Sequence, residues 1–139
     1  MKNTKLSVCF IAVLCVIALS LPVFASSARA SDQISMYYMD VSTSKGSIDV
    51  EFSIKGVGTV DKLGCQDIYV YTYKDNTWRF VRSFEEDDAG MSAKNTFTHA
   101  NLISFPADAG VEYEVIVTLF AENSAGRDTR YKIFYVTGE

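Results

Sequence analysis

A cysteine and a histidine are the residues of this sequence with the clearest capacity for chemistry. His99 is the only histidine of the chain, and Cys65 lies in a separate segment, LGCQDI. A thiol-dependent hydrolase needs at least a cysteine thiol and a histidine that activates it. No G-x-S-x-G turn and no cysteine-protease signature connects the two residues. We therefore expect a non-enzymatic protein without a cofactor, and a small secreted hydrolase that uses Cys65 and His99 is the alternative.

Four carboxylates follow one another at Glu85-Glu86-Asp87-Asp88. Calcium binds hard oxygen ligands of this kind, which makes Glu86, Asp87 and Asp88 the candidate metal ligands of the chain. The run lacks the alternating Asp-x-Asp-x-Asp spacing and the glycine of a calcium-binding loop. Charge runs are usually solvated turns, and we interpret this one in that way.

Aromatic residues alternate with aliphatic and polar ones in the segment DIYVYTYKDNTWRFVRSF, residues 67–84. The turn residues Asp75-Asn76 predict a β-hairpin. Its expected cross-strand pairs are Tyr73 with Trp78, Tyr71 with Phe80, and Tyr69 with Arg82. Because directly opposed residues share a face, one face is almost wholly aromatic. The other face carries Ile68, Val70, Thr72, Arg79, Val81 and Ser83.

The buried face of this hairpin decides whether it is a binding surface. The second face has threonine, arginine and serine among its aliphatic residues. The ordinary rule that apolar side chains lie inside therefore favours burial of the aromatic face, with tyrosine hydroxyls at the rim. In the alternative, the rings lie open to solvent beside Arg82. Such a surface stacks on sugar rings or anchors a protein partner, and its candidate ligand-binding residues are Tyr69, Tyr71, Tyr73, Trp78, Phe80 and Arg82.

The N-terminal segment predicts the compartment. Lys2 and Lys5 precede an apolar run over residues 6–24, and small residues follow it. This pattern indicates a signal peptide over residues 1–30, with cleavage after Ala25 or after Ala30. A membrane-spanning helix needs roughly 20 apolar residues, so the length of the run leaves an anchor open, but the small residues favour processing. We expect a secreted protein without a stable membrane anchor.

Charge and cysteine usage restrict the partners of the mature chain. Of the 13 basic residues, Lys2, Lys5 and Arg29 leave with the signal peptide, whereas all 17 acidic residues remain, for a formal charge of about −7. An acidic surface argues against nucleic acid, whose binding requires clustered lysine and arginine. Cys65 is left without an intramolecular disulfide partner, and a small buried apolar residue is its commonest role.

The remaining residues, 31–139, show the period-two pattern of strands almost throughout, and the pattern predicts one domain. Glycine and Asp/Asn clusters separate the strands. Several short strands with regular turns are typical of an all-β sandwich. The expected strands cover residues 34–41, 47–55, 67–73, 77–84, 96–103, 113–122 and 129–136.

Two segments resemble fibronectin type III domains. AENSAG, residues 121–126, matches the A-x-N-x-x-G turn after the sixth strand of that family, and FPADAGVEY, residues 105–113, resembles its tyrosine corner. The resemblance implies a single immunoglobulin-like (fibronectin type III-like) antiparallel β-sandwich of about seven strands. A tyrosine at such a corner buries its ring and bonds nearby backbone through its hydroxyl, which we expect of Tyr113.

The sequence as a whole favours a secreted binding module that recognises an extracellular protein or glycan. Fibronectin-type domains mostly serve as binding or spacer modules, so the resemblance implies recognition and supplies no catalytic residues. A structural subunit that assembles through its edge strands, or through a Cys65 link to a second chain, is a further alternative.

Overall fold

A computed structural model describes residues 33–139 of the chain. The expected signal peptide, residues 1–30, and both of its expected cleavage sites lie outside the described residues. The described part is all-β and antiparallel, as the alternating pattern predicts. No helix within it has the length and apolar character to cross a membrane. Its strands are β1 (Ile34–Ser44), β2 (Ser47–Lys74), β3 (Thr77–Glu85), β4 (Ser92–Pro106), β5 (Glu112–Asn123) and β6 (Gly126–Thr137).

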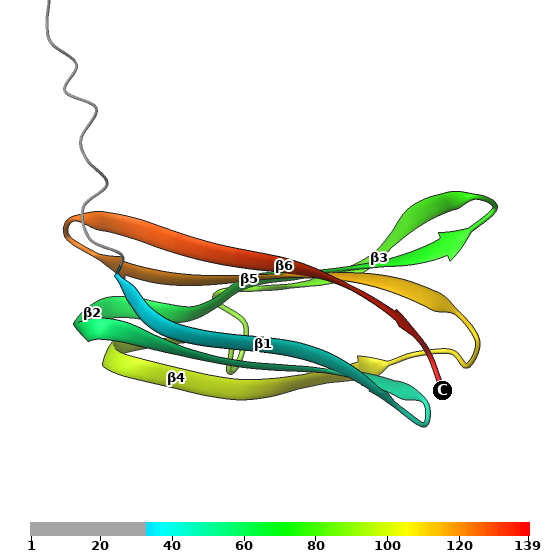
Figure 1. The fold of residues 1–139 in the computed structure, drawn as a ribbon, viewed down its shortest axis with the longest axis horizontal. Coiled ribbons are helices and arrows are strands. Elements are labelled where there is room, and N and C mark those ends of the chain that lie inside the picture. Colours follow the sequence, from blue (N-terminus) through cyan, green and yellow to red (C-terminus); the bar gives the residue numbers. More distant parts are fainter. Residues whose placement is uncertain (1–32) are drawn as a thin grey trace, which may run out of the picture. The chain divides into compact units, whose positions relative to one another are not determined.

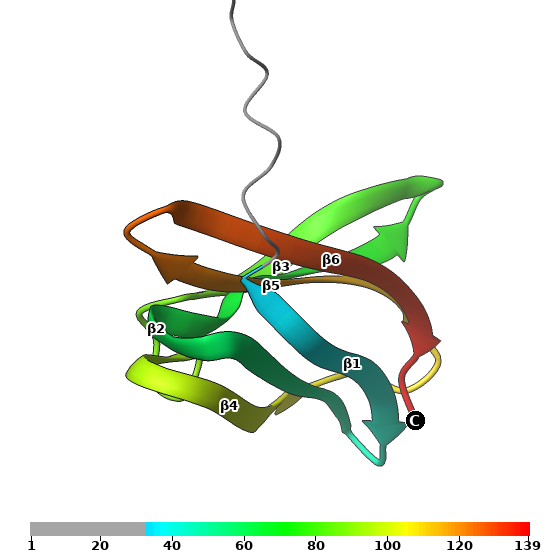
Figure 2. The same ribbon diagram turned by 60° about the vertical axis from the view of Figure 1, so that its left-hand side comes forward.

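One long strand, β2, organises the whole sheet. Over Ser47–Lys55 it pairs with β1 and β4, and over Asp67–Thr72 it pairs with β3 and β5, which in turn pairs with β6. The sheet therefore has two halves that share β2. It curls so that β5 and β6 lie over β1, β4 and the first part of β2 (Figures 1 and 2).

The expected count of seven strands is wrong, because two of the expected strands are parts of β2. Residues 47–55 and 67–73 belong to one strand of 28 residues. The register against β4 shifts between Lys55 and Val60, in the segment that holds Gly56 and Gly58, but the strand does not end there. Gly58 adopts a φ of +77°, which only glycine reaches readily, so the chain bends here without a turn.

The core lies between the two halves of the sheet. Period-two alternation in β2 and β5 points one set of aliphatic side chains inward, and these side chains are fully buried. Full burial of a large aliphatic or aromatic side chain stabilises the fold by about 1.5–3 kcal/mol. The buried set includes Ile48, Val50, Phe52 and Ile54 from the first part of β2 and Val115, Val117 and Leu119 from β5.

Tyr113, at the start of β5, has the burial and the hydrogen bond that the sequence predicts for it. The ring of Tyr113 is buried, and the backbone N–H of Asp108 donates a hydrogen bond of 2.9 Å to its hydroxyl. The turn after β5 has a matching local bond, because the N–H of Ala125 donates to Oδ1 of Asn123 at 2.8 Å. The physical expectation for Tyr113 is thus confirmed.

Candidate functional site

The aromatic face of the hairpin lies on the outside of the sheet, so the prediction that it is core is wrong. Ile68 and Val70 are fully buried, and the alternation of β2 turns Tyr69, Tyr71 and Tyr73 outward. The reason is non-local. Ile68 and Val70 pair with Val117 and Val115 of β5, and this valine-rich strand lies against the other half of the sheet.

A β-bulge in β3 removes Arg82 from the aromatic face. Tyr73 lies opposite Trp78, and Tyr71 opposite Phe80, as the sequence predicts. The register then shifts, so that Arg82 pairs with Val70 and Tyr69 pairs with Ser83. One inserted residue exchanges the two faces of a strand.

Arg82 consequently lies on the core side. Its guanidinium carbon lies 5.6 Å from the ring centroid of Phe105. The ring of Phe84, two residues later, packs against the same phenylalanine at 5.9 Å. The predicted pairing of Tyr69 with Arg82 is therefore wrong, and Arg82 is a packing residue rather than part of the candidate site.

Strands β5 and β6 extend the outer face beyond the hairpin. Glu114 pairs with Tyr71 on one side and with Tyr135 on the other, and Ile116 lies between Tyr69 and Ile133 in the same way. We call the outward side chains of this half of the sheet the aromatic face. Its members are Tyr69, Tyr71, Tyr73, Trp78, Phe80, Ile116, Tyr131, Ile133 and Tyr135.

Sequence reasoning missed the contribution of β6. The signal was present, because tyrosine and isoleucine occupy alternate positions in RYKIFYV, residues 130–136. Only the order of strands in the sheet reveals that this alternation continues the surface of the hairpin.

The rings of the aromatic face contact one another. The ring centroids are 5.0 Å apart for Tyr73 and Trp78, and 5.7 Å apart for Trp78 and Tyr135. Their ring planes are inclined by 53° and 45°, respectively. Tyr71 and Phe80 meet edge to face at 5.8 Å. Such tilted contacts are the favoured geometry of aromatic pairs, and they restrict the motion of the rings.

The face exposes a large apolar area to solvent. Exposed fractions are 41%, 36%, 58%, 71% and 64% for Tyr73, Trp78, Phe80, Tyr131 and Tyr135. At about 200 Å² for a whole aromatic side chain, these rings expose about 500 Å². This area is at the upper end of the roughly 300–600 Å² found for the largest apolar patch of a soluble monomer, and such patches are often functional.

Two grooves open at one end of the aromatic face, and both are lined by Glu112 and Thr137. One has a volume of about 440 Å³, and Trp78, Tyr113, Tyr135 and Val136 complete its lining. The other, of about 620 Å³, is completed by Thr72, Tyr73, Lys74, Asp108, Gly110 and Val111. A carboxylate therefore lines both grooves in company with aromatic rings at this end.

Carboxylates also raise the pKa of two tyrosines on the aromatic face. A hydrogen bond with Glu114 raises the pKa of Tyr135, and the charge of Glu85, followed by that of Asp67, raises the pKa of Tyr69. Neither Glu112 nor Glu114 forms an ion pair with any residue in 33–139. Lys74 lines the larger groove together with Glu112, but within the described part of the chain neither Glu112 nor Glu114 is held in a salt bridge at this end of the face.

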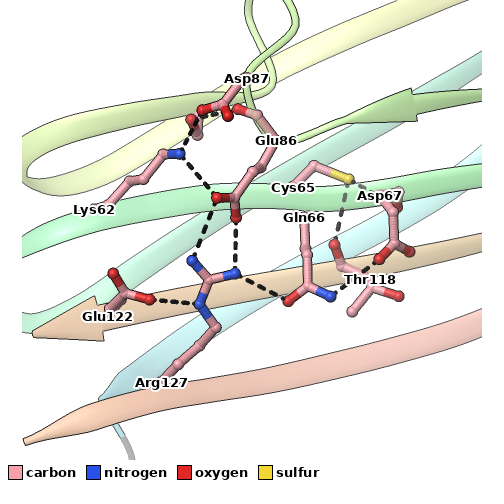
Figure 3. Close-up of polar contacts among 10 residues, drawn as sticks. Lys62, Cys65, Gln66, Asp67, Glu86, Asp87, Thr118, Glu122 and Arg127 are labelled. Atoms are coloured by element: carbon pink, nitrogen blue, oxygen red, sulfur yellow. Dashed lines mark hydrogen bonds and ion pairs between the residues drawn. The ribbon is translucent and has the colours of Figure 1, made fainter.

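The acidic run forms ion pairs with basic side chains (Figure 3). Glu86 accepts from Lys62 at 3.1 Å and from Arg127 at 2.7 Å, and Asp87 accepts from Lys62 at 2.8 Å. These bonds hold the pKa of both carboxyls below their ordinary values. Asp88 instead accepts a hydrogen bond of 2.8 Å from the backbone N–H of Glu85.

The candidate metal ligands therefore have structural partners. Arg127 lies over the buried ring of Phe120, with 4.2 Å from its guanidinium carbon to the ring centroid, and it also bonds Glu122 at 2.6 Å. Glu86 ties this arginine to the segment that follows β3. Among residues 33–139, no cluster of histidine, cysteine and acidic side chains has the arrangement of a metal site.

Cys65 and His99 do not form a catalytic pair. The Cys65 thiol is fully buried and donates to the carbonyl oxygens of Asp67 and Thr118 at 3.3 and 3.4 Å. Burial raises its pKa to about 12. Nε2 of His99 lies 2.8 Å from the carbonyl oxygen of Gly90, and its ring packs against Phe52. A protonated, inaccessible thiol is a poor nucleophile.

Comparison with solved structures finds several similar chains, of which Spo0M is an example. The fold is similar to that of Spo0M, a sporulation control protein from Bacillus subtilis, with a TM-score of 0.45 and 13% sequence identity. The similarity covers 74% of this chain and 48% of that chain, so this chain spans about half the length of that protein. No protein-family model and no curated protein matches the sequence.

Proposed function

We propose that this chain is a secreted, non-catalytic binding module that recognises an extracellular protein through its aromatic face. The exposure of several mutually packed rings on one side of the sheet carries this proposal. Tyrosine and tryptophan are the residues that most often dominate the binding energy of protein interfaces. Burying about 500 Å² of aromatic surface would supply most of the roughly 800 Å² per partner of a standard interface.

The burial of the nucleophile supports binding rather than catalysis. The thiol of Cys65 lies in the core with a raised pKa, and His99 bonds a backbone carbonyl. A hydrolase would need the two side chains to meet at an accessible surface. This is why we propose no enzyme activity.

We also propose that the fold is a fibronectin type III-like variant of the immunoglobulin sandwich. The partition of strands supports this relationship: β1 and β4 flank the first part of β2, whereas β3, β5 and β6 lie with its last part. The hydrogen bond of Tyr113 at the corner before β5 supports it as well. In such modules, recognition is a property of individual surfaces, so the fold alone identifies no ligand.

A glycan is the second candidate ligand. Exposed tyrosine and tryptophan rings favour it, because sugars stack on such rings. The inclinations of 45° and 53° between neighbouring ring planes offer no extended flat platform, which is why a protein is our first choice.

The proposal is tested with a double variant, Trp78→Ala with Tyr135→Ala, and a matched control, Tyr38→Ala. Tyr38 is 49% exposed on β1, in the other half of the sheet. The mature proteins are applied to a panel of immobilised extracellular proteins and glycans. We expect binding to a protein that the double variant loses and the control retains. Binding that all three proteins share equally, or that only glycans support, would contradict the proposal.

Light scattering of the same three proteins tests the structural-subunit alternative. A soluble assembly that survives in the double variant would favour association through strand edges. We expect a monomer in all three cases.

A further inference from the structure

We infer that the groove between Trp78, Tyr135 and Glu112 receives an arginine side chain presented by the protein partner. This inference rests on the proposed function and specifies the chemistry of the ligand. The groove has a volume of about 440 Å³, which is ample for one side chain.

The walls of the groove suit a flat cation. Trp78 and Tyr135 have ring centroids 5.7 Å apart and planes inclined by 45°, and the ring of Tyr73 contacts Trp78 at 5.0 Å. Guanidinium groups stack on aromatic faces, where the ring quadrupole attracts the positive charge. The indole of Trp78 is 36% exposed, so one part of it is anchored and another part is free for stacking.

The charges of the groove select a cation. Glu112 lines the groove, Glu114 lies one row further along β5, and neither has an ion-pair partner in the described part of the chain. Lys74 lines the neighbouring groove of about 620 Å³ together with Glu112 and forms no ion pair with it. Arg79, at the tip of the hairpin, is already paired with Asp75 at 2.8 Å. The groove with Trp78 is therefore lined by one carboxylate and no basic side chain, and the formal charge of the whole chain, −4, is also negative.

Arginine fits these features better than other ligand groups. An anionic ligand would be repelled by Glu112 and Glu114. Lysine carries a strongly hydrated point charge, whereas the planar guanidinium both stacks on rings and donates two parallel hydrogen bonds to a carboxylate. The combination of an aromatic wall and an unpaired carboxylate is therefore complementary to arginine.

The test compares N-acetyl-arginine amide with N-acetyl-citrulline amide, which is its uncharged isostere. Trp78 is the only tryptophan, so its fluorescence reports on the groove, and amide chemical shifts locate the binding site. We expect the arginine amide to bind at millimolar concentrations with shifts at the start of β5 and the end of β6. The citrulline amide should bind about tenfold more weakly, because it lacks the cation–π contact and the ion pair.

Two variants connect the binding to Glu112. Glu112→Gln should weaken binding of the arginine amide about threefold to fivefold, as expected for a partly exposed ion pair. The matched control is Glu51→Gln, which removes one charge from an exposed position of β2 in the other half of the sheet. It should leave the affinity unchanged.

The outcomes separate this inference from the proposed function. Equal binding of the two amides, no binding of either, or equal effects of Glu112→Gln and Glu51→Gln would overturn the inference. None of these results decides whether the Trp78→Ala, Tyr135→Ala variant loses binding to its protein partner, which is the test of the proposed function. If that variant binds its protein normally, the proposed function fails, whatever the amides do.

Discussion

Trp78 and Tyr135 place their ring centroids 5.7 Å apart, although β2 and β5 lie between their strands in the sheet. The hairpin of β2 and β3 makes this contact possible, because it rises out of the plane of β5 and β6 (Figures 1 and 2). The two rings therefore line one groove together with Glu112, although they come from strands that are not neighbours. The shape of the candidate site depends on tertiary packing of the hairpin.

The contact between Trp78 and Tyr135 predicts a specific fluorescence response. In Tyr135→Ala, the indole loses a neighbour that covers it, so acrylamide should quench its emission more strongly than in the unaltered protein. Tyr131→Ala is the control, because Tyr131 is 71% exposed on the same strand and two rows away. A blue-shifted, quencher-resistant emission in all three proteins would contradict an exposed aromatic face.

The buried thiol predicts a loss of stability at alkaline pH. The pKa of Cys65 is raised from 9.0 to about 12 in the folded protein. Above pH 9 the unfolded chain loses this proton and the folded chain keeps it, so the free energy of unfolding falls as pH rises. The fall from this residue reaches about 4 kcal/mol once the folded thiol also ionises.

Urea unfolding at pH 8, 9 and 10 measures this effect. The difference in stability between the unaltered protein and Cys65→Ala isolates it, because the two proteins have the same titratable groups apart from this thiol. The unaltered protein should lose stability relative to the variant by about 1 kcal/mol per pH unit above pH 9. Parallel curves for the two proteins would show that the thiol ionises as freely in the folded state as in the unfolded chain.

Arg127 should be the most important of the paired basic residues for stability. It contacts the ring of Phe120 at 4.2 Å and bonds both Glu86 and Glu122, so Arg127→Ala should cost about 1–3 kcal/mol of unfolding free energy. Arg79→Ala is the matched control. Its pair with Asp75 is exposed and should contribute less than about 1 kcal/mol. Equal losses in the two variants would mean that the network around Phe120 adds nothing beyond an ordinary surface pair.

The same network predicts sensitivity to acid. The hydrogen bond from Arg127 lowers the pKa of Glu86, so its stabilisation is complete above the ordinary glutamate pKa and is lost as pH falls through the lowered value. Between pH 5 and pH 3, the melting temperature of the unaltered protein should therefore fall further than that of Arg127→Ala. Calcium or EDTA should leave the melting temperature unchanged at neutral pH, because Glu86 and Asp87 are already paired. A stabilising effect of calcium would show that these carboxylates prefer the metal.

The hydroxyl of Tyr113 should contribute to the stability of the fold. Tyr113→Phe keeps the buried ring and leaves the N–H of Asp108 without its acceptor, which should cost about 1 kcal/mol. Tyr131→Phe removes an exposed hydroxyl and should cost almost nothing. Thermal unfolding of both variants measures the difference, and a neutral Tyr113→Phe would mean that water replaces the lost bond without penalty.

The sequence predicted local structure well and the choice of faces poorly. Every expected strand lies in a β-strand of the structure, because alternation and turn residues act over a few positions. Which hairpin face is buried depends on the pairing of Val70 with Val115. Such a pairing between distant strands cannot be predicted from the local alternation of apolar and polar residues. The bulge that moves Arg82 to the core side could not be predicted either, since no glycine or proline lies at its position.

Some residues of the candidate site could be predicted from the local sequence, and others could not. Tyr73 and Trp78 could be paired from the turn between them, whereas Tyr135 and Glu112 could not be assigned without the order of the strands. Glu112 follows the turn before β5 and has no distinguishing motif. Its importance comes only from the rings that surround it.

The continuity of β2 has a consequence for how the protein opens. This strand of 28 residues carries ladder hydrogen bonds to four others, so the two halves of the sheet share one strand in spite of its bend at Gly58. Fluctuations that expose the backbone of one half must break pairing in the strand that the other half also uses. We therefore expect amide protons of β2 at Phe52 and at Val70 to exchange with deuterium at the same slow rate, through one cooperative global opening.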